Sequence, residues 1–129
     1  MSNKKKYRYF TLSEFASPDL EGSGSNMKHE FLIKLDEARH LANIPFKINS
    51  GFRTAAYNQY LLDSPKYKAS KTSTHLEGIA ADISVKDSRS RWVVINSLML
   101  AGFTRIGIAD TFIHVDLSKE KSQNVIWTY

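Results

Sequence analysis

A histidine and an aspartate stand seven residues apart in the stretch 73–82, which reads Ser-Thr-His-Leu-Glu-Gly-Ile-Ala-Ala-Asp. His75 and Asp82 cannot coordinate one ion from a continuous helix. They can do so if the chain turns at Gly78 and continues as a strand that carries Asp82. Glycine and the small residues after it allow such a close backbone approach. The stretch therefore predicts two ligands of one metal ion.

A further histidine lies in residues 112–116, Phe-Ile-His-Val-Asp, which are expected to form a strand. Alternate residues of a strand share a face, so His114 and Asp116 point to one side and the aliphatic residues point to the core. Burying two polar groups without partners would cost on the order of a few kcal/mol. This face is therefore predicted to serve a polar site.

Together, His75, Asp82 and His114 make a ligand set typical of catalytic zinc. The chain has no cysteine, which excludes disulfides, thiolate zinc sites and a cysteine nucleophile. Catalytic zinc commonly has three protein ligands and a fourth position for water, whose pKa the ion lowers to about 7. We expect one Zn²⁺ per chain.

These motifs resemble those of a known family. Ser-x-His-x-x-Gly-x-Ala-x-Asp over 73–82, followed by His-Val-Asp at 114–116, is similar to the zinc D-alanyl-D-alanine carboxypeptidase family, which also holds L-alanyl-D-glutamate endopeptidases of phage lysins. Residues 11–15 (Thr-Leu-Ser-Glu-Phe) and 44–54 (Ile-Pro-Phe-Lys-Ile-Asn-Ser-Gly-Phe-Arg-Thr) look like the family's opening segment and its Ser-Gly-aromatic-Arg strand end. The likeness spans residues 10–117 and implies the fold that this family shares with the hedgehog signalling domain.

The resemblance also implies roles for individual residues. His75, Asp82 and His114 match the zinc ligands. Arg53 would reach the cleft, where a guanidinium can hold a substrate carboxylate or stabilise a developing oxyanion. Ser73 would order the His75 loop or contact the substrate.

The general base is less clearly marked. Many relatives carry an acidic residue three positions before the last histidine ligand, where this chain has Thr111. The nearest carboxylates belong to Asp110 and Asp116. Asp110 is the favoured base that activates water, while Asp116 is either the alternative base or a partner that orients a metal ligand.

Hydrophobic spacing and turn residues predict the elements that must position these side chains. The first helix is expected to begin after Asn26 as its N-cap, and the third to bury Trp92, Ile95, Leu98 and Met99. Helices are predicted over 27–42, 54–62 and 88–101, and strands over 7–12, 46–50, 80–85, 104–108, 112–117 and 125–127. The strands 104–108 and 112–117 should form a hairpin. The fold class is therefore α+β, a small antiparallel β-sheet flanked by helices, of the hedgehog/DD-peptidase type that the resemblance implies.

Length and charge limit the remaining choices. The 129 residues, 42% of them hydrophobic, fit a single zinc peptidase domain over 1–129, with residues 1–6 as a flexible basic end. The net charge of +5 favours an anionic partner, but no Lys/Arg stripe with interleaved aromatics predicts nucleic-acid binding. There is no apolar run of the ~20 residues that a membrane span needs. With no visible signal peptide, we expect synthesis in the cytoplasm and action at the bacterial cell wall after release.

The sequence thus predicts a zinc metallopeptidase that hydrolyses an amide bond in the stem peptide of peptidoglycan. It leaves open a D-Ala-D-Ala carboxypeptidase and an endopeptidase, the latter in keeping with a phage lysis enzyme. The alternative is an inactive, zinc-stabilised binding or virion-structural domain of the same fold, which the threonine at position 111 favours.

Overall fold

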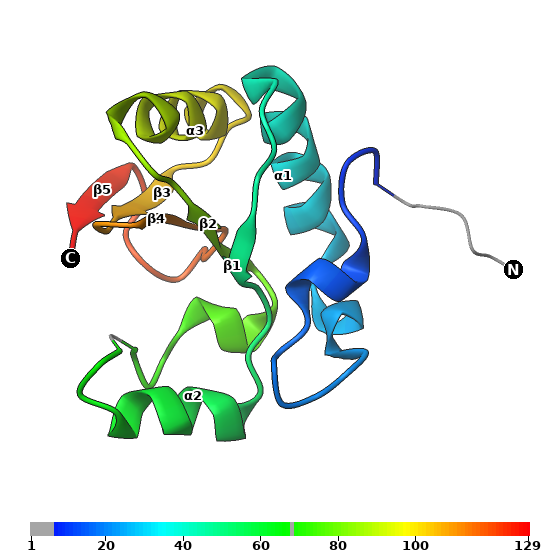
Figure 1. Ribbon diagram of the computed structural model, residues 1–129, viewed down its shortest axis with the longest axis vertical. Helices are drawn as coiled ribbons and strands as arrows, with labels where there is room; N and C mark the ends of the chain where they lie inside the picture. The colour runs from blue at the N-terminus through cyan, green and yellow to red at the C-terminus, as the bar shows by residue number, and fades with distance from the viewer. Residues whose placement is uncertain (1–6, 68) are drawn as a thin grey trace, which may run out of the picture.

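Residues 7–67 and 69–129 are described by the computed structural model in Figure 1. The predicted basic end, residues 1–6, lies outside them. Three α-helices, three short 3₁₀ helices and five strands follow one another as η1 (Leu12–Phe15), η2 (Ser23–Asn26), α1 (His29–Ala42), β1 (Ile48–Ser50), α2 (Ala55–Asp63), η3 (Thr74–Glu77), β2 (Ala80–Ser84), α3 (Ser88–Leu100), β3 (Arg105–Ile108), β4 (Phe112–Asp116) and β5 (Val125–Thr128). This α+β composition confirms the predicted fold class.

The five strands form one sheet in the order β1-β2-β4-β3-β5. The pairs β1–β2, β2–β4 and β3–β4 are antiparallel, and the last of these is the predicted hairpin. β5 joins the free edge of β3 in parallel, so the sheet is mixed rather than wholly antiparallel. Residues 117–124 connect β4 to β5. They bring the chain to the side of β3 that β4 leaves free, where Val125 lies opposite Arg105 at the start of β3, so the two strands run in parallel.

The two faces of the sheet differ in polarity. Aliphatic residues of the central strands, such as Ile83, Ile113 and Val115, are fully buried against α1 and α3 on one face. In Figure 1, α3 lies above the sheet while α2 and the segment that follows it lie below. The alternation of side chains along a strand sends the polar residues of β2 and β4 to the face away from this core.

The predicted strand at 7–12 is wrong. Its residues pack along α1 instead, where the backbone N–H groups of Arg8 and Tyr9 donate to the Asp36 carboxylate at 2.8 and 2.9 Å. The Tyr7 hydroxyl also hydrogen-bonds the His29 ring at 2.7 Å. Helix side chains thus satisfy backbone groups that a neighbouring strand would otherwise have paired.

Two details of the predicted helices are also wrong. Lys28, and not Asn26, is the N-cap of α1, because Asn26 closes η2 and its side-chain amide donates to the Ser23 carbonyl at 3.1 Å. In α3, Leu98 is buried as expected, but Trp92 and Met99 are 65% and 54% exposed. Fewer of the apolar side chains of α3 are therefore buried than the sequence predicts.

None of the helices within residues 7–67 and 69–129 has the length and apolar character that crossing a membrane requires.

Gly78 makes the turn that the sequence predicts between the His75 loop and β2. It ends η3 with φ +73, in the left-handed region that favours glycine. A Cβ at this position would lie 2.2 Å from the carbonyl oxygen of Asn26. The turn is therefore fixed both by its backbone conformation and by a neighbouring chain segment.

We expect Gly78→Ala to be more destabilising than Gly22→Ala, which makes a matched control. Gly22 also has a positive φ of 82, but a Cβ there meets nothing within 4 Å, so its replacement adds only backbone strain of about 1–2 kcal/mol. The clash with Asn26 should cost Gly78→Ala roughly 1–3 kcal/mol more. Urea unfolding measures both, and equal losses would contradict the predicted contact.

Candidate metal centre

The antiparallel register of β2 and β4 sets Asp82 directly opposite His114. The same transverse row continues through Gly107 on β3 and Trp127 on β5. All four residues lie on the face of the sheet away from the core, and the two side chains that could bind a metal meet at its centre. Residues 32 positions apart in sequence are thus brought together by backbone pairing alone.

His75 reaches this row from η3, which lies between α2 and β2. The Ser73 hydroxyl, at the N-cap of η3, accepts the His75 backbone N–H at 3.2 Å. The ring Nδ1 lies 2.7 Å from the Gly51 carbonyl oxygen, which can only accept, so Nδ1 carries the proton. Nε2 is therefore left without one and lies 3.3 Å from Asp82 Oδ1. Burial lowers the pKa of His75, which favours the neutral ring that a metal requires.

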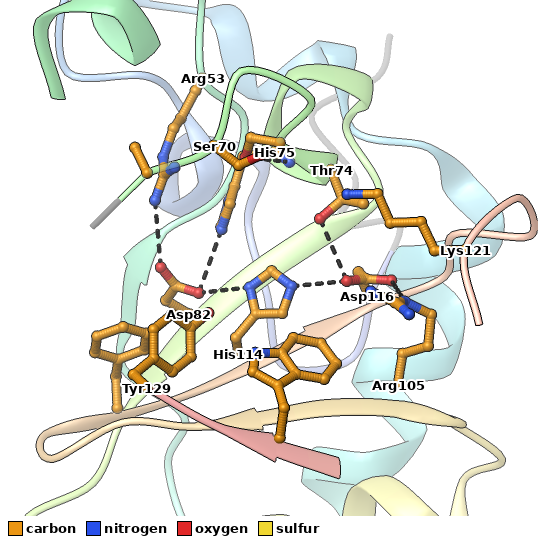
Figure 2. Close-up of a pocket in the computed structure, with 14 residues that line it drawn as sticks. Arg53, Ser70, Thr74, His75, Asp82, Arg105, His114, Asp116, Lys121 and Tyr129 are labelled. Carbon is orange, nitrogen blue, oxygen red and sulfur yellow. Dashed lines mark hydrogen bonds and ion pairs between the residues drawn. The ribbon is translucent and has the colours of Figure 1, made fainter. Parts of the chain in front are cut away.

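His114 lies between two carboxylates. Its Nδ1 is 3.0 Å from Asp82 Oδ1, and its Nε2 is 2.7 Å from Asp116 Oδ2 (Figure 2). Burial by itself would lower the pKa of His114, but hydrogen bonds to Asp116 and Asp82 raise it above its ordinary value. If a metal displaces the Nδ1 proton, the Nε2 proton remains bonded to Asp116 and holds the ring in place.

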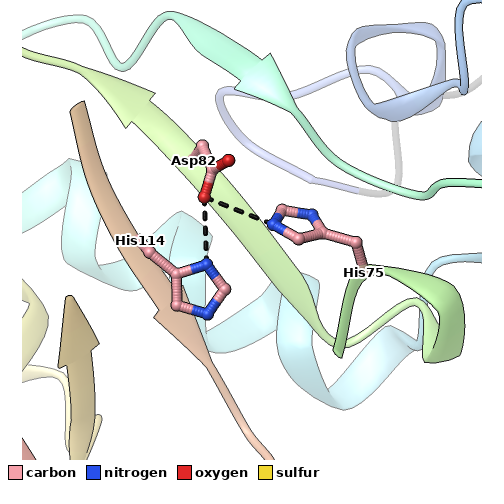
Figure 3. A group of neighbouring side chains, drawn as sticks. All are labelled: His75, Asp82 and His114. Carbon is pink, nitrogen blue, oxygen red and sulfur yellow. Dashed lines mark hydrogen bonds and ion pairs between the residues drawn. The ribbon is translucent and has the colours of Figure 1, made fainter. Parts of the chain in front are cut away.

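The three predicted ligands fit a zinc ion. Ligand atoms of His75, Asp82 and His114 all lie within 4.8 Å of one another, and all three residues are buried (Figure 3). Two imidazoles and a carboxylate, without thiolate, are the donor types of a catalytic zinc site that keeps one position open. The structure thus brings together all three residues that the sequence singles out as ligands.

The second oxygen of Asp82 is held by Arg53, whose NH2 group lies 3.4 Å away. Arg53 also donates to the Ser50 hydroxyl at 3.1 Å and to the Asn58 side-chain carbonyl at 3.4 Å. Burial opposes ionisation of Asp82, yet His75 and His114 hold the pKa of this carboxyl well below its ordinary range. Within residues 7–67 and 69–129 these contacts of Arg53 use three of the five N–H donors of the guanidinium, which leaves two for a bound molecule.

Asp116 is buried on the far side of the His114 ring from Asp82 (Figure 2). Its Oδ1 accepts from Arg105 Nε at 2.7 Å and from the Ser118 backbone N–H at 3.0 Å. Its Oδ2 accepts from the Thr74 hydroxyl at 3.3 Å as well as from His114. Burial raises the pKa of Asp116, but hydrogen bonds from His114 and Arg105 outweigh it and lower the pKa to about 2.

Two hollows meet at the candidate metal centre. The metal hollow, of about 250 Å³, has His75, His114 and Ser73 in its wall. The side hollow, of about 390 Å³, has Tyr57 and Lys66 in its wall. Both are open to solvent, and residues from the metal centre itself belong to both walls.

Asp110 and Thr111 lie in the turn between β3 and β4 and line the side hollow together with Asp82. The Asp110 side chain is exposed, while its backbone carbonyl accepts from Arg91 at 3.2 Å. Asp110 is thus part of the wall of the side hollow and not of the metal hollow.

Sequence reasoning missed Arg105, Trp127 and Tyr129. The Arg105 guanidinium lies 5.0 Å from the Trp127 ring, which in turn is 5.6 Å from the His114 ring. Burial and the Asp82 charge raise the pKa of Tyr129, which keeps its hydroxyl protonated near neutral pH. Alternation along residues 125–129 could have placed the two aromatic rings on one face, but no local pattern shows that this edge strand faces the site.

Comparison with protein families gives one match. The family model described as Peptidase M15 matches residues 8–116, which include all three candidate ligands. A search of the curated proteins found no match.

The pH dependence of unfolding should reveal the buried Asp116 carboxylate in the metal-free protein. Its pKa falls from an ordinary 3.8 to about 2 on folding, so its stabilisation is present above the unfolded value and is lost as the pH falls through about 2. The difference corresponds to roughly 2 kcal/mol. We expect the gap in unfolding free energy between wild type and Asp116→Asn to narrow by roughly 1.5 kcal/mol between about pH 5 and pH 2.5, because at pH 2.5 the folded carboxylate is still mostly ionised. If urea titrations gave the same difference in unfolding free energy at both pH values, the lowered pKa of Asp116 would be wrong.

Proposed function

The chain belongs to the peptidase M15 family, and from this premise we propose that it is a zinc-dependent peptidase that hydrolyses an amide bond in the stem peptide of peptidoglycan. The single observation that carries the proposal is the convergence of His75, Asp82 and His114 in the wall of an open hollow. The proposed substrate makes the bacterial cell wall the site of action.

His75 through Nε2, Asp82 through Oδ1 and His114 through Nδ1 would hold the ion, because these atoms face one another. When bound, Zn²⁺ supplies a Lewis acid that polarises a carbonyl group and makes water more acidic. The Asp116 carboxylate would keep the His114 Nε2–H in place, and the Gly51 carbonyl would do the same for His75 Nδ1–H. These hydrogen bonds fix both rings in the orientation that metal binding requires.

Arg53 supports substrate binding in this scheme. It is part of the wall of both hollows, and its two remaining N–H groups can hold a substrate carboxylate or a carbonyl oxygen that gains negative charge. Ser73 also lines the metal hollow, where its hydroxyl already orders the His75 loop.

Asp110 is the proposed general base. It lines the side hollow next to Asp82 and is exposed, so its carboxylate can accept a proton from water and pass it to the leaving amine. Asp116 is less suited to this task because its two oxygens already accept four hydrogen bonds, from Arg105, Ser118, Thr74 and His114. We therefore assign Asp116 to positioning.

A second candidate function is a zinc-stabilised binding or virion-structural domain without activity. Thr111 favours it, because this side hollow carries a threonine where many relatives have an acidic residue. Zinc would then contribute to the stability of the fold, and the hollows would bind a ligand without cleaving it.

We expect the purified protein to cleave peptidoglycan in a zinc-dependent manner. A chelator should abolish turnover and added zinc should restore it, while His114→Ala should neither retain zinc nor cleave. Mass spectrometry of the products distinguishes the two activities, since free D-alanine identifies a carboxypeptidase and stem fragments identify an endopeptidase. One bound zinc per chain without turnover would overturn the enzyme proposal in favour of the binding domain.

For the base, Asp110→Asn should lower kcat by roughly 10²–10⁴-fold with the zinc content unchanged. Asp63→Asn is the matched control, because Asp63 is an exposed aspartate at the end of α2 whose side chain, among the described residues, bonds Gln59 alone, at 2.9 Å. Steady-state hydrolysis of the same fragments measures both variants. Full activity of Asp110→Asn would show that another group accepts the proton.

A further inference from the structure

Four residues belong to the walls of both the metal hollow and the side hollow. They are Arg53, Asp82, Phe112 and Tyr129. These four residues therefore mark the place where the two hollows meet. Asp82 is a proposed ligand and Arg53 its partner, so Tyr129 is the member of this set whose polar group has no role yet.

The Tyr129 ring is held in place although 46% of the residue is exposed. Its backbone N–H donates to the Ile108 carbonyl at 3.1 Å, which continues the pairing of β5 with β3 by one residue. The ring packs edge-on against Phe112, with centroids 5.5 Å apart and an interplanar angle of 61°. Figure 2 shows Tyr129 beside Asp82, on the other side of this carboxylate from Arg53. The phenol is thus preorganised at the junction of the two hollows.

The Tyr129 hydroxyl has a proton to donate. A phenol O–H can donate one hydrogen bond, and Tyr129 lines both hollows, where a bound molecule can accept it. The ring is therefore positioned by its packing on Phe112 and by the backbone pairing of Tyr129 with Ile108, and its O–H can be donated to a bound molecule.

We propose that Tyr129 is a further catalytic residue, whose hydroxyl donates a hydrogen bond to the carbonyl oxygen of the scissile amide where the two hollows meet. The inference rests on the proposed function, since it assigns a contact to the same substrate. A donor in this place gains strength as the carbonyl oxygen becomes negative, and it acts together with the remaining N–H groups of Arg53. Tyr129 lies beyond residues 8–116, so the family match does not include it.

Tyr129→Phe tests the inference because it removes the hydroxyl and keeps the ring that packs on Phe112. We expect kcat/KM on peptidoglycan fragments to fall by roughly 100-fold, mostly through kcat, since the bond is strongest in the transition state. Zinc stoichiometry and the unfolding midpoint should stay at wild-type values. Tyr60→Phe is the matched control, because Tyr60 is 60% exposed on α2 and outside both hollow walls.

The outcomes separate this inference from the proposed function. If wild type cleaves the fragments and Tyr129→Phe cleaves them within twofold as well, the catalytic role of Tyr129 is wrong and the peptidase proposal stands. If zinc-loaded wild type binds a soluble disaccharide-pentapeptide without cleaving it, the peptidase proposal fails. In that case, calorimetry compares how tightly wild type and Tyr129→Phe bind the disaccharide-pentapeptide. Binding by Tyr129→Phe that is at least about tenfold weaker than by wild type supports the contact between the Tyr129 hydroxyl and the ligand, and equal affinity overturns that contact. A wild-type protein that neither cleaves nor binds overturns both.

Discussion

The cross-strand contact between Asp82 and His114 is the interaction on which the rest of the site depends. It places a carboxylate in a buried position, where an unpaired negative charge would be strongly destabilising. The protein surrounds it with His114 on the neighbouring strand, His75 from η3 and Arg53 from the segment between β1 and α2. Each of these partners comes from a different element, so the loops around the sheet must return to this one carboxylate.

Beyond this contact the charges alternate in a continuous line. Arg53 faces Asp82, Asp82 faces His114, His114 faces Asp116, and Asp116 faces Arg105. The three inner groups, Asp82, His114 and Asp116, each have a partner of opposite sign on both sides when His114 is protonated, which reduces the cost of burying them. A divalent cation bound at Nδ1 would replace the proton that His114 otherwise carries there, so either could supply the positive charge beside Asp82. The same residues therefore serve the stability of the metal-free fold and the geometry of the loaded site.

Much of this arrangement could be predicted from local sequence patterns. Alternation along residues 112–116 identified the faces of β4, and the glycine in the 73–82 motif identified the turn that returns the chain to β2. The patterns failed where a distant partner decides the outcome. Residues 7–12 have strand-like composition, yet Asp36 on α1 takes their N–H groups. The roles of Arg105 and Trp127 depend on the register of β3 with its two neighbours, which no single segment encodes.

The positions of the two tryptophans allow intrinsic fluorescence to report on the candidate metal centre. Trp92 belongs to α3, the helix that covers the core face of the sheet, and its side chain is largely exposed to water. Trp127 lies across the sheet on the other face, 5.6 Å from the His114 ring and 5.0 Å from the Arg105 guanidinium. Emission from the two indoles therefore comes from separate environments, and only one of them senses the charge state of the imidazole beside it. In a background without Trp92, the fluorescence of the remaining indole reads the electrostatics of the site directly.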